Sequence, residues 1–167
     1  MKKLLLIVAL ALITGLTFSQ NLSAQGDTQL NLGVGFSNFG LPLYIGIDHY
    51  VSNDVTLGGE FSYRSGYNEY WDGRKYDRNV MGFSGNANYH FNRILEIPRT
   101  WDFYAGLNVG FYVWNKYDTY RGDNTSGLGL GGQIGGRYFL SNKVGLNLEF
   151  GGGNAFSGGK FGLTIKI

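Results

Sequence analysis

The sequence predicts an all-β protein, an eight-stranded antiparallel up-and-down transmembrane β-barrel. Apolar and polar residues alternate with a period of two through most of residues 25–167, which places successive side chains on opposite faces of a strand. The alternating segments are long, whereas soluble strands cluster near about five or six residues and tilted membrane-crossing strands need roughly 9–11. The chain also has 28 glycines, 3 Trp, 12 Tyr and 12 Phe but only two prolines, a composition that favours closely packed strands.

Eight segments show this alternation, at about 29–37, 41–51, 55–67, 79–91, 101–115, 127–140, 144–152 and 159–167. The third is typical: Val55, Leu57, Phe61 and Tyr63 share one face, and Thr56, Glu60, Ser62 and Arg64 share the other. In the fourth, fifth and sixth, the apolar faces carry Met81 to Phe91, Trp101 to Val113 and Leu128 to Leu140 at alternate positions. Glycine, serine, asparagine and charged residues fill the opposite faces, so each segment has one apolar and one polar face.

Lipid is the solvent that suits this pattern. The polar face lacks the Lys, Glu and Thr of a soluble barrel's exterior, and an apolar face turned to water would exceed the few hundred Å² that a soluble monomer tolerates. A closed barrel also satisfies every backbone N–H and C=O group within the hydrocarbon. The alternative is a soluble, lipocalin-like barrel whose apolar face lines a ligand cavity.

Residues 1–24 are predicted to be a cleaved signal peptide, and 25–167 a single barrel domain. Met1-Lys2-Lys3 is a positively charged start, and the apolar stretch from Leu4 to Leu16 is too short to span a bilayer. Ala24 is a suitable small residue before the cleavage point. Removing Lys2 and Lys3 reduces the 14 basic residues to 12, against 12 acidic ones, so the net charge is near zero. That balance excludes a nucleic-acid partner, and the absence of cysteine excludes a disulfide scaffold.

The connecting segments predict an orientation and a place for function. The links 52–54, 92–100 and 141–143 alternate with the longer or more polar links 68–78, 116–126 and 153–158, and in bacterial barrels the short turns face the periplasm. The link 92–100 is longer than expected for that side. We expect any extracellular ligand to bind at 68–78 and 116–126, with candidate contact residues Tyr70, Trp71, Arg74, Tyr76, Arg121 and Asp123. Alternatively, these are solvated loops whose aromatic residues lie against the barrel rim.

An internal repeat predicts how the interior is packed. Residues 45–61 align without gaps to 134–150, and both segments read as strand–turn–strand units around Ser-Asn. If Val51 pairs with Val55, and Leu140 with Val144, each large inward side chain meets a glycine on the next strand. The expected pairs are Glu60 with Gly46, Asp48 with Gly58, Glu149 with Gly135, and Phe139 with Gly145. The repeat fits either an ancestral duplication or common rules for such hairpins.

The inward charges predict a filled lumen and not a pore. An eight-stranded barrel is just wide enough to hold its own side chains, and unpaired buried charge is unfavourable. We therefore expect a buried ion-pair network made of Asp48, Glu60, Arg64, Asp102, Arg137, Glu149, Lys160 and Lys166.

The sequence offers little that could support catalysis. Only two histidines are present; His49 falls on the lipid face near a turn, and His90 points inward with no serine at its depth. A nucleophile needs a base within hydrogen-bond reach, so we expect no enzyme activity. No cysteine or clustered histidine suggests a metal, and no glycine run precedes a helix as a phosphate loop would, so we expect neither a metal nor a cofactor.

The segment Lys160–Ile167 resembles the terminal strand of outer-membrane β-barrels, which the barrel-insertion machinery reads, although such strands more often end in an aromatic residue. With the signal peptide, the Ser-Asn hairpins and Tyr89-x-Phe91, it makes residues 27–167 similar to the small OmpA/OmpX-type, porin-like outer-membrane barrels of Gram-negative bacteria. The resemblance implies an outer-membrane location in contact with lipid. It also implies a non-enzymatic role in envelope integrity or loop-mediated surface contacts. The alternative function is a narrow conduit for small apolar solutes, with the glycine-rich segments 127–136 and 151–153 as weak points of the wall.

Overall fold

The structure is a computed structural model of the chain, and it describes residues 26–36, 41–71, 74–114, 127–153 and 158–167. The predicted signal peptide lies outside these ranges. Within them, no helix has the length and apolar character needed to cross a bilayer. The described residues form the strands β1 (Thr28–Phe36), β2 (Leu43–Ser52), β3 (Val55–Trp71), β4 (Arg74–His90), β5 (Trp101–Trp114), β6 (Gly127–Phe139), β7 (Val144–Gly153) and β8 (Gly158–Lys166).

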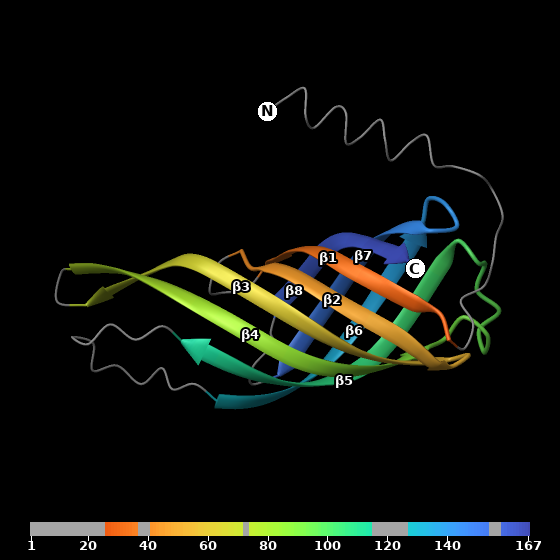
Figure 1. Cartoon of the computed structure of the whole chain (residues 1–167), viewed down its shortest axis with the longest axis horizontal. Coiled ribbons are helices and arrows are strands. Elements are labelled where there is room, and N and C mark those ends of the chain that lie inside the picture. Colours follow the sequence, from red (N-terminus) through yellow and green to blue (C-terminus); the bar gives the residue numbers. More distant parts are fainter. Residues whose placement is uncertain (1–25, 37–40, 72–73, 115–126, 154–157) are drawn as a thin grey trace, which may run out of the picture.

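The strands form one closed barrel in which each strand pairs with its sequence neighbours (Figure 1). The β1–β8 ladder closes it and runs from Gln29 opposite Lys166 to Phe36 opposite Gly159. Every pairing is antiparallel, so the predicted fold class is confirmed. Connections at 53–54, 91–100 and 140–143 lie at one end, which we call the turn end; the opposite end is the hairpin end.

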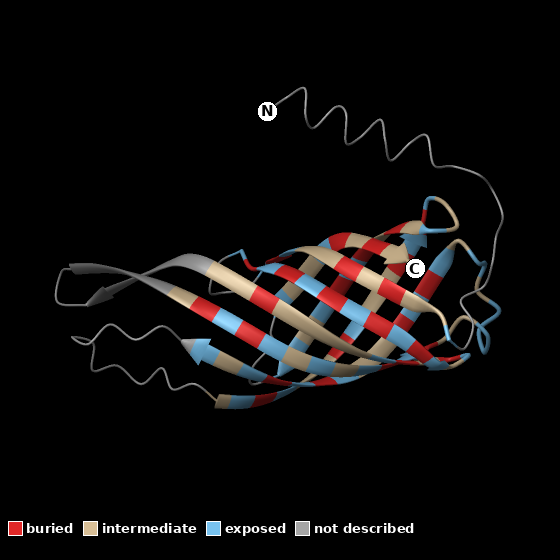
Figure 2. Ribbon diagram, in the orientation of Figure 1, coloured by how far each residue is buried: buried red, intermediate tan, exposed pale blue. Residues whose placement is uncertain are grey.

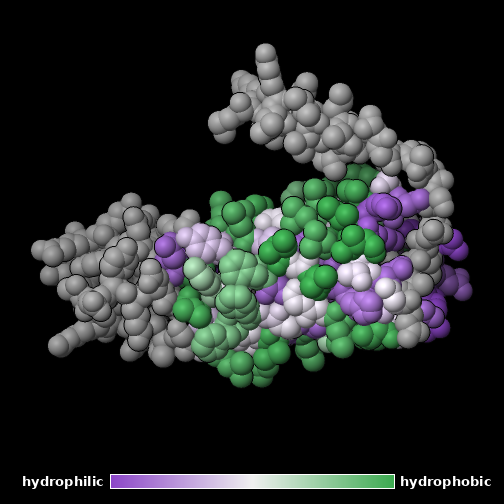
Figure 3. Space-filling view, in the orientation of Figure 1, coloured by the Kyte–Doolittle hydropathy of each residue, from purple (hydrophilic) through white to green (hydrophobic). Residues whose placement is uncertain are grey.

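Burial alternates along the strands, as a barrel with distinct inner and outer faces requires. In β2 every second residue from Tyr44 to Tyr50 is buried and its neighbours are exposed. Figure 2 shows the same checkered pattern over the other strands. The exposed positions are mainly large and apolar, and Figure 3 shows them as a band around the visible wall, with hydrophilic residues gathered at the turn end. Many of the buried positions are polar, the reverse of a soluble protein core.

The prediction of a loop at 68–78 is wrong. β3 continues to Trp71 and β4 starts at Arg74, so the two form a hairpin that projects beyond the neighbouring strands (Figure 1). The register shifts between Arg64 and Tyr67, and pairing then continues to Trp71 opposite Arg74. The polar composition of 68–78 suggested a loop, but cross-strand pairing extends the ladder regardless of polarity. Tyr70, Trp71, Arg74 and Tyr76 therefore lie on strands, whereas Arg121 and Asp123 lie outside the described residues.

The glycine pairings predicted from the internal repeat are confirmed. Gly46 opposes Glu60 and Gly58 opposes Asp48; in the second unit Gly135 opposes Glu149 and Gly145 opposes Phe139. The expected pairing of Val51 with Val55 is wrong, because a register shift after Tyr50 places Ser52 opposite Val55. A bulge of this kind adds one residue to a strand next to its turn.

The long turn between β4 and β5 is held by its own hydrogen bonds. The Leu95 N–H donates to the Phe91 carbonyl at 3.0 Å, and Asn92 accepts from the Phe103 N–H at 3.1 Å. Arg93 forms a hydrogen-bonded ion pair with Asp54 of the β2–β3 turn. The hydrogen bond to the Asp54 carboxylate raises the pKa of the Arg93 guanidinium. The paired side chains join two neighbouring turns at the turn end.

Candidate functional site

The lumen is lined by side chains from all eight strands, and glycines make room for the largest of them. A Cβ atom built on Gly131 would lie 2.6 Å from Asn108 Oδ1, and one on Gly145 would lie 2.9 Å from the Phe139 ring. The Tyr104 ring lies in the same way against Gly135. Real atoms do not approach so closely, so these glycines are needed where large inward residues cross the next strand.

Arg137 occupies the middle of the lumen. Its side chain is only 1 % exposed, and its guanidinium donates to Asp48 Oδ2 at 2.7 Å and to Asp102 Oδ2 at 3.2 Å. A third bond reaches Gln29 Oε1 at 2.6 Å. One arginine on β6 thus connects β1, β2 and β5 across the barrel, and the planar guanidinium suits this role because it offers five donors in fixed directions.

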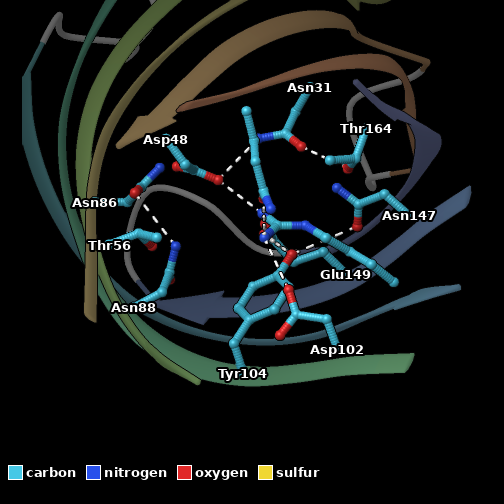
Figure 4. Close-up of polar contacts among 12 residues, drawn as sticks. Asn31, Asp48, Thr56, Asn86, Asn88, Asp102, Tyr104, Asn147, Glu149 and Thr164 are labelled. Atoms are coloured by element: carbon cyan, nitrogen blue, oxygen red, sulfur yellow. Dashed lines mark hydrogen bonds and ion pairs between the residues drawn. The ribbon is translucent and has the colours of Figure 1, made fainter. Parts of the chain in front are cut away.

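Arg137, Gln29, Asp48 and Asp102 form what we call the Arg137 layer. Neighbouring polar groups extend this layer around the wall. Asp48 also accepts from Asn31 Nδ2 at 2.8 Å, and Thr164 donates to Asn31 Oδ1 at 2.6 Å. The Arg137 guanidinium lies 4.5 Å from the centre of the Tyr104 ring. Figure 4 shows Asn31, Asp48, Asp102 and Tyr104 converging on this region. The layer therefore combines ion pairs, hydrogen bonds and a cation–π contact at one depth.

A second ion-pair cluster lies toward the hairpin end. Lys160 Nζ is 2.8 Å from Glu60 Oε2 and 2.8 Å from Glu149 Oε1, so one cation bridges two carboxylates. Tyr104 donates to the other Glu149 oxygen at 2.9 Å and so links this cluster to the Arg137 layer. The nearby cavity, lined in part by Tyr44 and Glu60, has a volume of about 40 Å³, close to that of one water molecule.

His90 joins the Arg137 layer from the turn end. Its Nδ1 lies 2.7 Å from Asp102 Oδ1 and 3.1 Å from the Tyr50 hydroxyl, and its Nε2 lies 3.1 Å from Thr56 Oγ1. The sequence indicated that His90 points inward but did not identify these partners. The inward, polar position of Thr56 on β3 is the sequence signal for this contact, since a threonine hydroxyl can take the place of a serine hydroxyl.

Thr56, His90 and Asp102 have the connectivity of a nucleophile, base and acid, but the Thr56 hydroxyl is closed off. Thr56 is fully buried and His90 is 3 % exposed, so no substrate can approach the hydroxyl. We interpret the trio as a structural hydrogen-bond chain. Within the ranges that the structure describes, no three His, Asp or Glu side chains are placed to hold a metal ion.

The structure brings together six of the eight residues expected to form a lumen network: Asp48, Asp102 and Arg137 in one layer, and Glu60, Glu149 and Lys160 in the other. The other two lie near the ends of the barrel. Lys166 Nζ is 4.1 Å from the centre of the Phe139 ring, and Arg64 lies beside the Tyr112 hydroxyl. Gln29 and Asn31 are the members that charge-based reasoning missed, because they are polar without being charged.

The apolar exterior, the closed ladder and the filled polar lumen together define an eight-stranded membrane-spanning β-barrel. His49 lies on the exposed face near the turn end, where its Nδ1 is 2.9 Å from Thr28 Oγ1. That surrounding suits a side chain at the membrane–water interface.

Solved structures of outer-membrane barrels share this fold. The outer membrane protein OprG of Pseudomonas aeruginosa superposes with a TM-score of 0.63 at 12% identity, covering 89% of this chain and 98% of that one. The N-terminal β-barrel domain of P. aeruginosa OprF gives 0.61 at 12% identity, covering 87% and 100%. The Yersinia pestis outer membrane protein Ail, solved in a phospholipid nanodisc, gives 0.54 at 14% identity, covering 85% and 99%. No protein-family model and no curated protein matches the chain. The chain thus has the fold of the eight-stranded outer-membrane barrels.

Proposed function

We propose that the protein is a non-enzymatic outer-membrane barrel of a Gram-negative bacterium, with a plugged lumen, that serves envelope integrity or surface contacts. The Arg137 layer carries this proposal, because its buried charges and hydrogen bonds occupy the middle of the barrel. A barrel of eight strands has little space beyond its own side chains. The turn end faces the periplasm and the hairpin end faces outward, and the alternating strand β8 suits recognition by the insertion machinery.

The plugged lumen predicts that the purified barrel forms no stable channels of porin size in planar bilayers. Ions would have to displace Arg137 from two carboxylates and a glutamine, which leaves buried charges without partners. A heat-dependent shift in SDS-gel mobility should first establish that the sample is folded. Sustained unitary current steps from that folded sample would contradict the proposal that side chains fill the lumen.

A narrow conduit for small apolar solutes is the second candidate function, and the glycine pairs between β6 and β7 favour it. Gly131 opposes Gly153 and Gly132 opposes Gly152, so the wall has no side chains at these positions. A side opening at this weak point of the wall would admit solutes from above the filled part of the lumen into the lipid. Liposome swelling separates the two candidates, because a closed barrel gives no solute-dependent swelling and a conduit does.

Surface contacts are best supported at the projecting β3–β4 hairpin. Its register pairs Tyr67 with Arg78, Glu69 with Tyr76, and Trp71 with Arg74, and it pairs Tyr70 with Lys75. Because partners across a ladder share a face and successive residues alternate, we expect the first six positions on one face of the ribbon and positions 70 and 75 on the other. Aromatic residues and arginine are enriched at protein interfaces, so the face that includes Trp71 is the one we assign to a protein partner.

A photo-crosslinking amino acid at each face of the hairpin tests this assignment. Placed at position 71 in intact cells, it should give a discrete protein adduct, whereas the matched substitution at Tyr70 should give none. Adjacent residues of a strand point to opposite faces, so the pair differs in direction and hardly in position. Equal labelling from both positions, or from neither, would remove the basis for a partner on this face.

A further inference from the structure

We propose that the long β4–β5 turn, residues 91–100, is an interaction surface for the phospholipid leaflet at the turn end of the barrel. Two adjacent aliphatic residues of this turn, Ile94 and Leu95, are 67 % and 64 % exposed, and we call them the turn patch. The other turns at this end, 53–54 and 141–143, contain only polar residues. Adjacent large apolar side chains beside the lipid-facing wall mark a surface that a partner covers.

The turn patch is held in a defined conformation. The Leu95 N–H donates to the Phe91 carbonyl at 3.0 Å, and the Ile97 N–H donates to the Asn92 carbonyl at 2.9 Å. Glu96 has a φ of 51°, a left-handed conformation that residues other than glycine rarely adopt. Such a conformation persists only where the surrounding structure fixes it, so the two aliphatic side chains are presented in a set direction.

The turn has a polar side and an apolar side. Asn92, Arg93 and Arg99 line the cavity of about 200 Å³ at the mouth of the lumen. Ile94 and Leu95 are not part of that lining, and they are the exposed aliphatic residues of the turn. The polar residues therefore face the lumen, and the turn patch lies away from it, as in segments that rest in a membrane interface.

The turn patch continues a surface that already faces lipid. Phe91 and Trp101, at the two ends of the turn, line a hollow of about 470 Å³ on the outer wall, together with Phe103 and Tyr138. The Trp101 ring lies 5.5 Å from Phe103 and 4.7 Å from Tyr138, measured between ring centres. Aromatic side chains at the ends of membrane strands lie at headgroup level. A turn that starts at this rim meets the headgroups and upper acyl chains of the same leaflet.

The lipid needs no particular charge. Arg93 forms an ion pair with Asp54, so the apolar side chains of the turn patch carry the attraction, and zwitterionic phosphatidylcholine should suffice. Because the contact lies on one side of the barrel, it would fix how deep and how tilted the barrel sits in the bilayer. This role goes beyond the surface and structural roles proposed above. It does not depend on the filled lumen, so the two proposals fail in different experiments.

Fluorescence quenching tests the contact in the folded barrel. The chain has no cysteine, so Leu95→Cys provides a single attachment point for the environment-sensitive dye NBD, and Lys143→Cys provides a matched point in a polar turn at the same end. In phosphatidylcholine nanodiscs, a nitroxide near the headgroup end of the lipid acyl chain should quench the dye at position 95 and not at position 143. Iodide in the buffer should quench position 95 at least about threefold less than position 143. Ile94→Cys should behave as Leu95→Cys does.

Two neighbouring substitutions show whether apolar side chains are the cause. In the protein labelled at position 95, Ile94→Ser should weaken the nitroxide quenching, whereas Glu96→Gln, which changes a charge in the same turn, should leave it unchanged. Each variant is used after its heat-dependent gel shift shows a folded barrel. Equal iodide quenching at positions 95 and 143 would overturn the proposal and leave the turn patch to a periplasmic protein. Nitroxide quenching that appears only after anionic phosphatidylglycerol is added would overturn the apolar mechanism.

Discussion

Replacing Arg137 by methionine should lower the free energy of unfolding of the barrel by about 3–5 kcal/mol, the range found when one partner of a buried ion pair is removed. Methionine keeps much of the side-chain volume, but it removes the guanidinium that pairs with the buried Asp48 and Asp102 and donates to Gln29. Urea unfolding of the barrel in lipid vesicles, followed by tryptophan fluorescence, measures the change. The effect should be the largest of any single substitution in the lumen, since Arg137 contacts three strands.

Two further variants show whether charge is the cause. Arg93→Met removes an arginine whose side chain is 68 % exposed, and it should leave the unfolding curve unchanged. Adding Asp48→Asn and Asp102→Asn to Arg137→Met should recover part of the lost stability, because no uncompensated carboxylate then stays buried. A loss in the triple variant equal to that in Arg137→Met would mean that packing, and not charge, is responsible.

Replacing Lys160 by methionine should lower the free energy of unfolding by about 2–3 kcal/mol at neutral pH. The value is below that for Arg137 because the Lys160 side chain is 24 % exposed and water screens part of the interaction. Without Lys160, Glu60 and Glu149 face each other with like charge. Neutralising one of the two carboxylates relieves that repulsion, so adding Glu60→Gln to Lys160→Met should recover part of the lost stability.

Urea unfolding of these variants in lipid vesicles measures the recovery. Adding Glu149→Gln as well should recover more of the stability, because neither carboxylate of the pair then keeps its charge. An equal loss in Lys160→Met with and without Glu60→Gln would show that the two carboxylates do not interact.

Much of the fold could be predicted because alternation and strand length are local properties of the sequence. A period of two fixes which side of the wall each residue occupies, and so the sequence alone places Asp48 and Arg137 in the lumen. The glycine pairings followed from counting residues outward from two turns. The same counting failed next to the β2–β3 turn, where the bulge after Tyr50 adds a residue that no composition signal marks.

The partners within the lumen could not be predicted, because side chains that share a face can belong to any of eight strands. That Arg137 meets Gln29 depends on the shear of the closed barrel, which the sequence of one strand does not encode. His90 shows the same limit: its direction followed from alternation, but its contact with Thr56 on β3 depends on register. The hairpin extension was missed for another reason, since the polar residues between 68 and 78 are compatible with both a loop and a solvated ladder.

The seam between β1 and β8 determines when this protein can fold. Gln29 pairs with Lys166, so the partners are 166 − 29 = 137 residues apart. The longest-range side-chain bonds depend on the same closure: Thr164 with Asn31, Arg137 with Gln29, and Lys160 with Glu60 are separated by 133, 108 and 100 residues. Bringing such distant segments together is entropically unfavourable until the contacts form. The first strand must therefore wait for the eighth to be synthesised, and the barrel cannot close while the chain is still incomplete.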